Sequence, residues 1–307
     1  MRVGMGEVEA VKALTNQLSA LDDEYGGQHA RPMAAAFLVN TVAPYLRAEA
    51  SEEVRRAMQH AAAMASYVTG WMAVDEGLHG LAQQYYVKGL ELARMSGDRM
   101  AYCHILRGMS VQAADLGHGP TARHLAEVSA GAAPSSSPRM RAFITGQQAY
   151  AYAVAGDRTR AWSALREAER AVSQAESPVG RLGGFSAATL AYATAQVHVS
   201  LGDTKSSVRS LHDHFKLRDH TDSRRSELLH ASLLAERQIA TGYLDAACAT
   251  WDRVLTAYPA MHSGRVDARV RSATRLLTPH LAHPLARQTH DRARSLLAQR
   301  SARVQAL

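Results

Sequence analysis

Several residue types that build β-sheets are scarce in this sequence. Aromatic residues make up only 6% of the chain, and proline occurs nine times among 307 residues. Because strands favour β-branched and aromatic residues, this scarcity argues against a sheet-based fold, whereas the abundance of alanine favours helices. Apolar residues still make up 47% and charged residues 21%. These proportions support a buried core and exclude a disordered chain.

Cysteines and long apolar runs are also scarce. Cys103 and Cys248 are the only two cysteines, which excludes a disulfide framework and predicts two buried, inert thiols in a reduced compartment. The longest early apolar run, Met33 to Val39, is far shorter than the ~20 residues that span a bilayer. No secretory signal is recognisable at the N-terminus. We therefore expect a cytoplasmic protein that makes no membrane contact.

Positive charge is concentrated at one end of the chain. The formal net charge is +7, and residues 264–307 alone hold nine Arg against two Asp. The preceding residues therefore balance to zero, and the basic character belongs to the last helices. Four of these arginines are the candidates for contacts with phosphates: Arg265, Arg269, Arg275 and Arg292.

The clearest pattern in the sequence is an internal repeat. A glycine recurs at intervals of 40, 39, 46 and 40 residues, and a small residue stands five positions after each glycine. The glycines are Gly77, Gly117, Gly156, Gly202 and Gly242, and the small residues are Ala82, Ala122, Ala161, Ser207 and Ala247. Pro134 and Pro259 follow the second and fifth glycines by seventeen positions.

This pattern predicts a helix–turn–helix unit. Glycine ends the first helix because it adopts the left-handed conformation of a helix C-terminus. The small residue lets the second helix approach the first closely, and proline ends the second helix. No such pair buries its apolar face alone, so neighbouring pairs stack. We expect an all-α fold with N-terminal helices in residues 1–62, five repeats in 63–262 and a basic C-terminal cap in 263–307.

The glycine, alanine and proline offsets resemble those of tetratricopeptide repeats. The best match is the fifth copy, from Ala240 through Gly242 and Ala247 to Pro259, although the spacing exceeds the 34-residue period of that family throughout. The resemblance implies a right-handed α-solenoid of tetratricopeptide-like helical hairpins, in which the first helix of each hairpin lines a concave groove.

Nearly the whole chain also resembles a narrower group. The segments Tyr25–Arg31, Gly70–Ala73, His79–Tyr86 and Leu116–His118 are similar to the C-terminal region of actinobacterial helix-turn-helix regulators of the XRE class. That resemblance implies a sensor or dimerisation region linked to transcriptional regulation, and a homodimer. The DNA-binding domain of those regulators has no counterpart here, so DNA binding is not carried over with the resemblance.

Motifs for catalysis or for metals are missing. The fifteen histidines form neither an H-E-x-x-H motif nor a pattern with paired cysteines, and Gly180–Gly184 neither follows a strand nor continues into Gly-Lys-Ser. We interpret the histidines as solvated or capping residues, and we find no Ser/His/Asp set fixed by sequence. We therefore expect no enzyme activity, no metal and no cofactor.

The candidate binding residues come from the implied groove. The groove positions of the tetratricopeptide family, placed on the recurring glycines, give Tyr67, Trp71, Asp75, His104, Arg107, Val111, Tyr150, Tyr192, Gln196 and Glu236. An aromatic and polar strip of this kind can hold a peptide, a protein partner or a small signal. Each of these side chains could equally fill the gaps between repeats. Tyr85, Tyr86, Trp162 and Trp251 follow the second-helix pattern and are expected in the core.

Two functions remain open from the sequence. The first is a non-enzymatic regulatory recognition module with a concave binding groove. The alternative is a nucleic-acid-associated protein that contacts phosphates through its Arg-rich C-terminal helices. The second function is weaker because the arginines do not share one helical face, and aromatic residues do not alternate with them.

Overall fold

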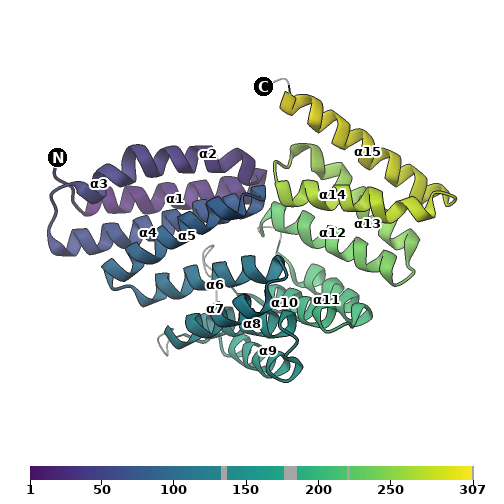
Figure 1. Cartoon of the computed structure of the whole chain (residues 1–307), viewed down its shortest axis with the longest axis horizontal. Helices are drawn as coiled ribbons and strands as arrows, with labels where there is room; N and C mark the ends of the chain where they lie inside the picture. The colour runs from purple at the N-terminus through teal and green to yellow at the C-terminus, as the bar shows by residue number, and fades with distance from the viewer. Residues whose placement is uncertain (133–136, 176–184, 220–221, 306–307) are drawn as a thin grey trace.

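A computed structural model describes residues 1–132, 137–175, 185–219 and 222–305, and these residues are almost entirely helical (Figure 1). The helices are α1 (Met5–Tyr25), α2 (Gly27–Phe37), α3 (Ala43–Arg47), α4 (Glu52–Glu76), α5 (His79–Ser96), α6 (Arg99–Asp115), α7 (Gly119–Ala132), α8 (Pro138–Val154), α9 (Arg158–Ser173), α10 (Ala187–Ser200), α11 (Thr204–Leu217), α12 (Arg224–Ala240), α13 (Leu244–Ala257), α14 (Gly264–Leu277) and α15 (Pro284–Gln305). No strand forms among the described residues, where a single bridge joins Arg2 and Glu49. The expected all-α class is confirmed.

Neighbouring helices pack in pairs, and each predicted glycine lies at the turn inside a pair. The pairs are α4/α5, α6/α7, α8/α9, α10/α11 and α12/α13. All five glycines have φ between 78° and 87°, the left-handed region in which a side chain would be strained. The five small residues of the pattern are fully buried, with 0% exposure. The predicted helix–turn–helix units are therefore confirmed.

The N-terminal helices differ from the expected pair. The sequence predicts helices over 6–25 and 29–47, with Pro44 kinking or ending the second. In the structure α2 continues into a π-helical turn, Leu38–Val42, before the short helix α3, which carries Pro44 in its first turn. Proline lacks the N–H of a regular helix, and its ring crowds the carbonyl four residues earlier, so the wider turn precedes it.

The first repeat begins earlier than the expected boundary at residue 63. Helix α4 starts at Glu52, and the hydroxyl of Ser51 accepts a hydrogen bond of 3.3 Å from the backbone N–H of Val54. The sequence predicts Ser51 as the N-cap of a helix, since serine is favoured there, and the structure confirms it. The cap fixes the start of a 25-residue helix that is longer than a tetratricopeptide helix requires.

The end of the chain forms one more pair. The sequence predicts a capping hairpin over about Arg265–Val304 that breaks near Pro279–Pro284. Helices α14 and α15 pack together and are separated by a 3₁₀ turn, Thr278–His280, so this hairpin is confirmed. Pro259 lies in a 3₁₀ turn directly after α13, as predicted. Pro134 and the segment 177–184, interpreted as a loop, lie outside the described residues.

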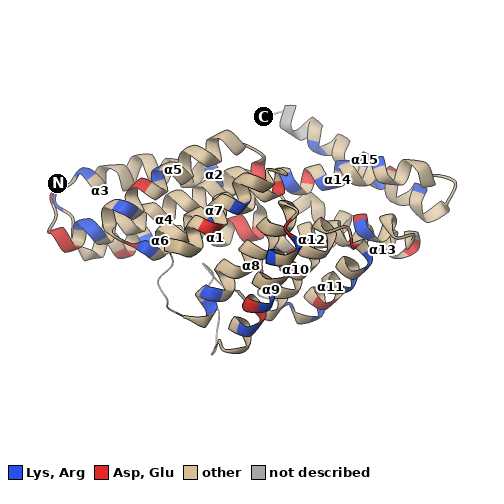
Figure 2. Ribbon diagram, turned by 60° about the horizontal axis from the view of Figure 1, so that its bottom comes forward, with Lys and Arg blue, Asp and Glu red and all other residues tan. Residues whose placement is uncertain are grey.

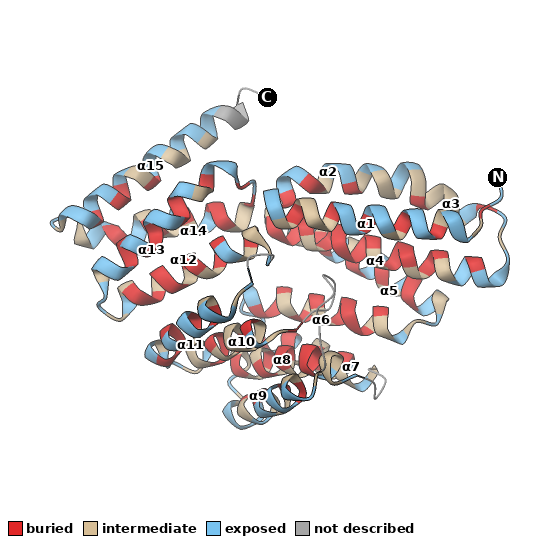
Figure 3. Cartoon of the chain, turned by 180° about the vertical axis from the view of Figure 1, so that it is seen from behind, coloured by how far each residue is buried: buried red, intermediate tan, exposed pale blue. Residues whose placement is uncertain are grey.

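The succession of pairs curves so that its two ends meet. Helix α12 packs against α1, and α14 packs against α4 (Figure 1). The apolar core is divided among the pairs, and its largest part joins α1, α2, α4 and α5, with Tyr86 and Met72 fully buried (Figure 3). Trp251 is fully buried as expected, whereas Tyr85 and Trp162 are half-buried. Among the described residues, no helix has the length and apolar character needed to cross a bilayer.

Candidate functional site on the inner face

The predicted groove residues all lie on the first helices of the pairs. We call the side of α4, α6, α8, α10 and α12 that carries them, together with the side of α14 that contacts it, the inner face. Four of the ten residues are buried: Tyr67, Asp75, His104 and Gln196. The other six are half-buried: Trp71, Arg107, Val111, Tyr150, Tyr192 and Glu236. None is exposed, so the strip contacts other parts of the chain over much of its length.

The first group of contacts joins α4, α6 and α8. The ring of His104 lies edge-on to Tyr67, with centroids 4.6 Å apart, and 4.8 Å from the ring of Phe143. One turn further along α6, the guanidinium of Arg107 stacks 3.8 Å above the Phe143 ring and donates a hydrogen bond to the Phe143 carbonyl. These contacts fix the His104 side chain between two aromatic rings.

A second group links the middle of the strip to α14. The carboxylate of Asp115 on α6 accepts hydrogen bonds from the hydroxyl of Tyr150, at 3.1 Å, and from the guanidinium of Arg265, at 2.8 Å. The same guanidinium lies 5.9 Å from the ring centre of Trp71. Trp71 and Tyr150 are therefore brought together through Asp115 and Arg265, which the sequence did not place beside them.

The third group involves α10, α11 and α12. Tyr192 stacks on His230 at 3.8 Å, and His230 forms a hydrogen bond with the buried His214. The interpretation of the histidines as solvated or capping residues is therefore wrong for His214. Burial lowers the pKa of both imidazoles, so they remain neutral and can share one hydrogen bond.

Arginine side chains contact two further residues of the predicted groove. Gln196 accepts a hydrogen bond of 2.5 Å from Arg237, which also donates to the buried hydroxyl of Ser207. Glu236 forms an ion pair with Arg269 at 3.0 Å. Both residues therefore make internal contacts, although the second carboxylate oxygen of Glu236 is buried without a hydrogen-bond partner.

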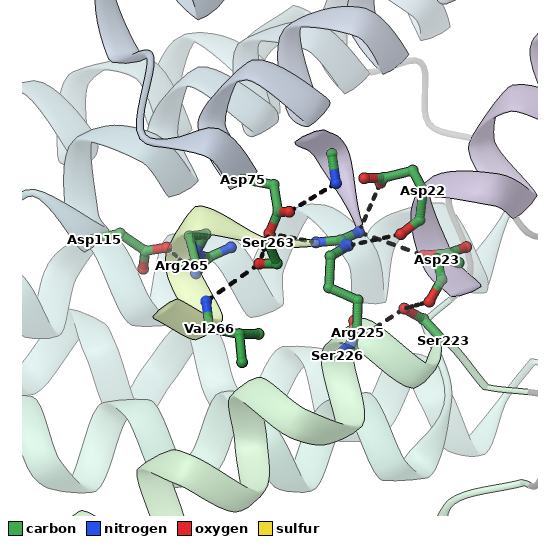
Figure 4. A network of polar contacts seen from close by, with 11 residues as sticks. Asp22, Asp23, Asp75, Asp115, Ser223, Arg225, Ser226, Ser263, Arg265 and Val266 are labelled. Atoms are coloured by element: carbon green, nitrogen blue, oxygen red, sulfur yellow. Dashed lines mark hydrogen bonds and ion pairs between the residues drawn. The ribbon is translucent and has the colours of Figure 1, made fainter. Parts of the chain in front are cut away.

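Asp75 belongs to a buried ionic cluster that joins the two ends of the chain (Figure 4). Its carboxylate accepts hydrogen bonds from the backbone N–H of Gly27 at 2.9 Å and from the hydroxyl of Ser263 at 2.7 Å. The guanidinium of Arg225 lies 3.6 Å away and donates to Asp22 at 2.9 Å. We call Asp22, Asp75, Arg225 and Ser263 the clasp. With 0% exposure, Asp75 is part of this internal cluster and not of an open groove.

The clasp contains two carboxylates, Asp22 and Asp75, but only one guanidinium, that of Arg225. Burial raises the pKa of Asp22 to about 7; Arg225 opposes this shift, and Asp75 and Asp23 reinforce it. Three neighbouring carboxylates also raise the pKa of Arg225, despite its burial. One oxygen of Asp22 is buried without a hydrogen-bond partner.

Open space remains at one end of the inner face, beyond Tyr67 and His104. A cavity of about 300 Å³ lies among α1, α4, α6 and α8, and we call it the α1–α6 cavity. Its walls include the thioethers of Met64, Met100 and Met140 and the side chains of His60 and His104. Helix α1 contributes Lys12, Thr15 and Asn16. This volume lies at the lower end of the range for small-molecule sites.

His104 is the one predicted groove residue in the wall of this cavity. Its side chain is 6% exposed, and within the described residues no hydrogen bond joins either ring nitrogen to the protein. Burial, assisted by the charge of Arg107, lowers the pKa of His104 to about 3. The ring is therefore neutral and offers one donor and one acceptor. The ring nitrogens are not among the solvent-inaccessible atoms that lack a partner, so they remain accessible to water or to a ligand in the cavity.

His60 and Asp98 form the rim next to α6. The Nδ1 atom of His60 lies 2.7 Å from one carboxylate oxygen of Asp98, and the other oxygen accepts from the backbone N–H of Ala101 at the start of α6. Asp98 thus caps α6 and orients His60 at the same time.

Other candidate sites are less developed. A second cavity of about 430 Å³ lies between α10 and α11 and contains none of the predicted residues. In the described part of the chain, no three His, Cys, Asp or Glu residues are arranged to hold a metal ion. Cys103 and Cys248 are buried free thiols whose pKa is raised by burial, in keeping with the expected inert role.

Figure 2 shows acidic residues among the basic ones on the C-terminal helices. Three of the four candidate phosphate-binding arginines contact carboxylates. Arg265 pairs with Asp115, Arg269 with Glu236, and Arg292 with Asp252. Arg275 is exposed and contacts the hydroxyl of Ser272. Acidic partners therefore interrupt the basic C-terminal helices, and phosphate binding there would compete with existing ion pairs.

Most residues of the cavity wall are not among those predicted from the sequence. His60 and Met64 lie seven and three residues before Tyr67, so an extension of the α4 stripe by two turns could have found them. Lys12, Thr15 and Asn16 come from α1, outside the repeats, and no repeat pattern points to them. A comparison with protein-family models finds no family that matches this chain, and a search among curated proteins finds none similar to it.

Proposed function

We propose that the chain is a right-handed α-solenoid of tetratricopeptide-like hairpins and works as a non-enzymatic recognition module. Three features support this proposal: the paired helices, the glycines in left-handed conformation at the turns, and the fully buried small residue after each turn. By resemblance to regulators of the XRE class, the module serves transcriptional regulation and forms a homodimer.

Within this proposal, the ligand is a small signal molecule and not an extended peptide. A peptide along the whole strip would have to displace the contacts of Arg265 with Asp115, of Arg269 with Glu236, and of Arg237 with Gln196. The α1–α6 cavity needs no such displacement. The observation that carries the proposal is the neutral imidazole of His104 in the wall of this cavity, which makes no hydrogen bond within the described residues and can bond to a ligand there.

Binding in the cavity acts on the arrangement of the helices. The cavity walls come from α1, α4, α6 and α8, and α1 and α4 are also the helices that carry Asp22 and Asp75 of the clasp. A ligand that prefers the closed arrangement of these helices shifts the population towards it. This coupling is how a recognition module without catalytic groups can transmit a signal.

Thermal unfolding in the presence of a chemically diverse panel of small molecules tests the proposal. We expect some compounds to raise the melting temperature by several degrees, because a ligand at 100 times its Kd stabilises the folded state by about 2.7 kcal/mol. Ala101→Leu, which adds carbon atoms to the wall, abolishes this effect, and Ala13→Leu on the exposed surface of α1 preserves it.

Mass spectrometry of the compound after incubation separates recognition from catalysis. The proposal requires that the ligand is recovered unchanged. Conversion of the compound, or a panel without any stabilising member, would contradict the proposed function.

A further inference from the structure

The chemistry of the α1–α6 cavity narrows the class of its ligand, on the premise of the proposed function. Its apolar walls include the side chains of Met64, Met100 and Met140, from three different helices, together with Ala61 and Ala101. Methionine is flexible and polarisable, so walls of this kind adapt to an apolar body of variable shape. The walls therefore suit an aliphatic or aromatic hydrocarbon group.

The charge in the cavity lining is positive. Lys12 is the charged residue in the lining, and no carboxylate lines the cavity. The ammonium of Lys12 contacts Glu9 on the same helix, but both side chains are largely exposed, at 40% and 63%, and an exposed pair of this kind is weak. The carboxylate of Asp98 near the rim is engaged by His60 and by the backbone of α6. An anionic group in the cavity would therefore meet a cation and no unpaired acid.

An anionic ligand can also accept a hydrogen bond from His104. The imidazole is held between Tyr67 and Phe143, so it cannot turn away to find water elsewhere. It offers an N–H to an oxygen atom in the cavity. A carboxylate has two oxygen atoms and can accept from an ammonium and an imidazole N–H together.

We infer that the α1–α6 cavity binds a small apolar carboxylic acid, with its hydrocarbon body between the three methionines and its carboxylate on Lys12 and His104. The acid carries a negative charge at neutral pH, which distinguishes it from alcohols and amines of the same length. Lys12 and His104 provide the specificity, and the methionines provide most of the contact area.

Displacement of 8-anilinonaphthalene-1-sulfonate, a fluorescent apolar anion, measures this specificity. The competitors are decanoate, 1-decanol and decylamine, which share one chain length and differ in the charge of the head group. We expect decanoate to displace the dye at the lowest concentration and decylamine at the highest. Equal displacement by decanoate and decanol would overturn the assignment of the carboxylate.

Two substitutions locate the polar end of the ligand. Lys12→Gln and His104→Phe each weaken decanoate about three- to tenfold and leave decanol nearly unchanged, because only the charged head group uses these donors. Lys88→Gln is the matched control: Lys88 also pairs with a glutamate three residues away at 2.9 Å, on an exposed helix face, and lies outside the cavity lining. A loss in the control equal to that in Lys12→Gln would contradict the site.

The failure of this inference is distinguishable from the failure of the proposed function. Ala101→Leu removes binding of all three competitors if the cavity is the site. Binding that depends on Ala101 but ranks decanol or decylamine first would overturn the carboxylic acid and retain the recognition module. Dye binding and competition that survive Ala101→Leu unchanged would place the ligand elsewhere and overturn both. Circular dichroism melting of each variant verifies that it folds.

Discussion

Arg225 on α12 donates a hydrogen bond of 2.9 Å to Asp22 on α1, across 203 residues of chain. Both side chains are only 4% exposed, and Asp75 on α4 completes the group. A buried cation between two helices that are far apart in sequence decides how the first and last parts of the array meet. The clasp therefore defines the closed arrangement on which the proposed signalling depends.

Arg225→Met will destabilise the protein strongly. The substitution keeps much of the side-chain volume but leaves the buried carboxylates of Asp22 and Asp75 without a cation, and such a loss costs about 3–5 kcal/mol. Urea unfolding measures the change. The neighbouring Arg224 pairs with Glu24 at 3.2 Å on an exposed surface, so Arg224→Met should cost less than about 1 kcal/mol. Similar losses in both variants would contradict a structural role for the clasp.

Asp22 gives the stability a specific dependence on pH. Its pKa is raised from 3.8 to about 7, so the folded state binds this proton more tightly than the unfolded state. The contribution of Asp22 to the free energy of unfolding therefore falls as pH rises from about 4 to about 7, and is level above that. Asp22→Asn, which stays neutral, should gain roughly 1–3 kcal/mol relative to wild type over this range.

Urea unfolding at pH 4.5, 6, 7 and 8 checks the prediction for Asp22. Only the difference between wild type and variant is informative, because other groups titrate in both proteins. A difference that stays constant with pH, or that favours the wild type as pH rises, would mean that Asp22 is ionised in the folded protein throughout.

Gly146 is required for the packing of α8. A Cβ atom at this position would lie 2.5 Å from the ring of Phe185, a separation that forces the ring or the helix to move. Gly146→Ala should cost about 1–3 kcal/mol by overpacking. At Gly80 on α5 a Cβ would meet nothing within 4 Å, so Gly80→Ala should stabilise the protein by about 0.5 kcal/mol. Thermal or urea unfolding measures the stability of both variants. Equal changes in stability for Gly146→Ala and Gly80→Ala would contradict the role of Gly146 in packing.

The contact between Asp115 and Arg265 predicts a measurable coupling across the inner face. A double-mutant cycle with Asp115→Ala and Arg265→Ala should give about 0.5–1 kcal/mol, as expected for a half-exposed ion pair at 2.8 Å. The cycle between Asp115 and Arg269 is the control, because Arg269 pairs with Glu236 instead. Additive effects in the first cycle would show that α6 and α14 are not energetically linked.

The repeat was readable from the sequence because its signals are local. A glycine such as Gly156 ends a helix through its own backbone conformation, and Ala161 permits close packing with the helix next to it in the chain. The pairing of Arg225 with Asp22 and the cavity wall on α1 were not readable. They depend on how the helices are arranged in three dimensions. Each pair is rotated slightly relative to the pair before it, and the total rotation along the array cannot be read from a residue pattern.

The candidate site was predicted in part for the same reason. The groove positions implied by the tetratricopeptide resemblance placed His104 and Tyr67 on one surface, and the structure brings their rings together. The sequence pattern could not indicate that Arg265 would contact Trp71 and Asp115. Arg265 lies on α14, and the curvature of the whole array is what brings α14 next to α4 and α6.

The long separation between the partners of the clasp has a consequence during translation. The carboxylates of Asp22 and Asp75 leave the ribosome well before Arg225, and at 5–20 residues per second the 203 residues between Asp22 and Arg225 take about 10–40 s to synthesise. Throughout that interval the nascent N-terminal helices present these acids to water instead of to their cation. The contacts of α1 with α12 and of α4 with α14 can form only when the C-terminal third has emerged, so this closure is a late step in folding of the newly made chain.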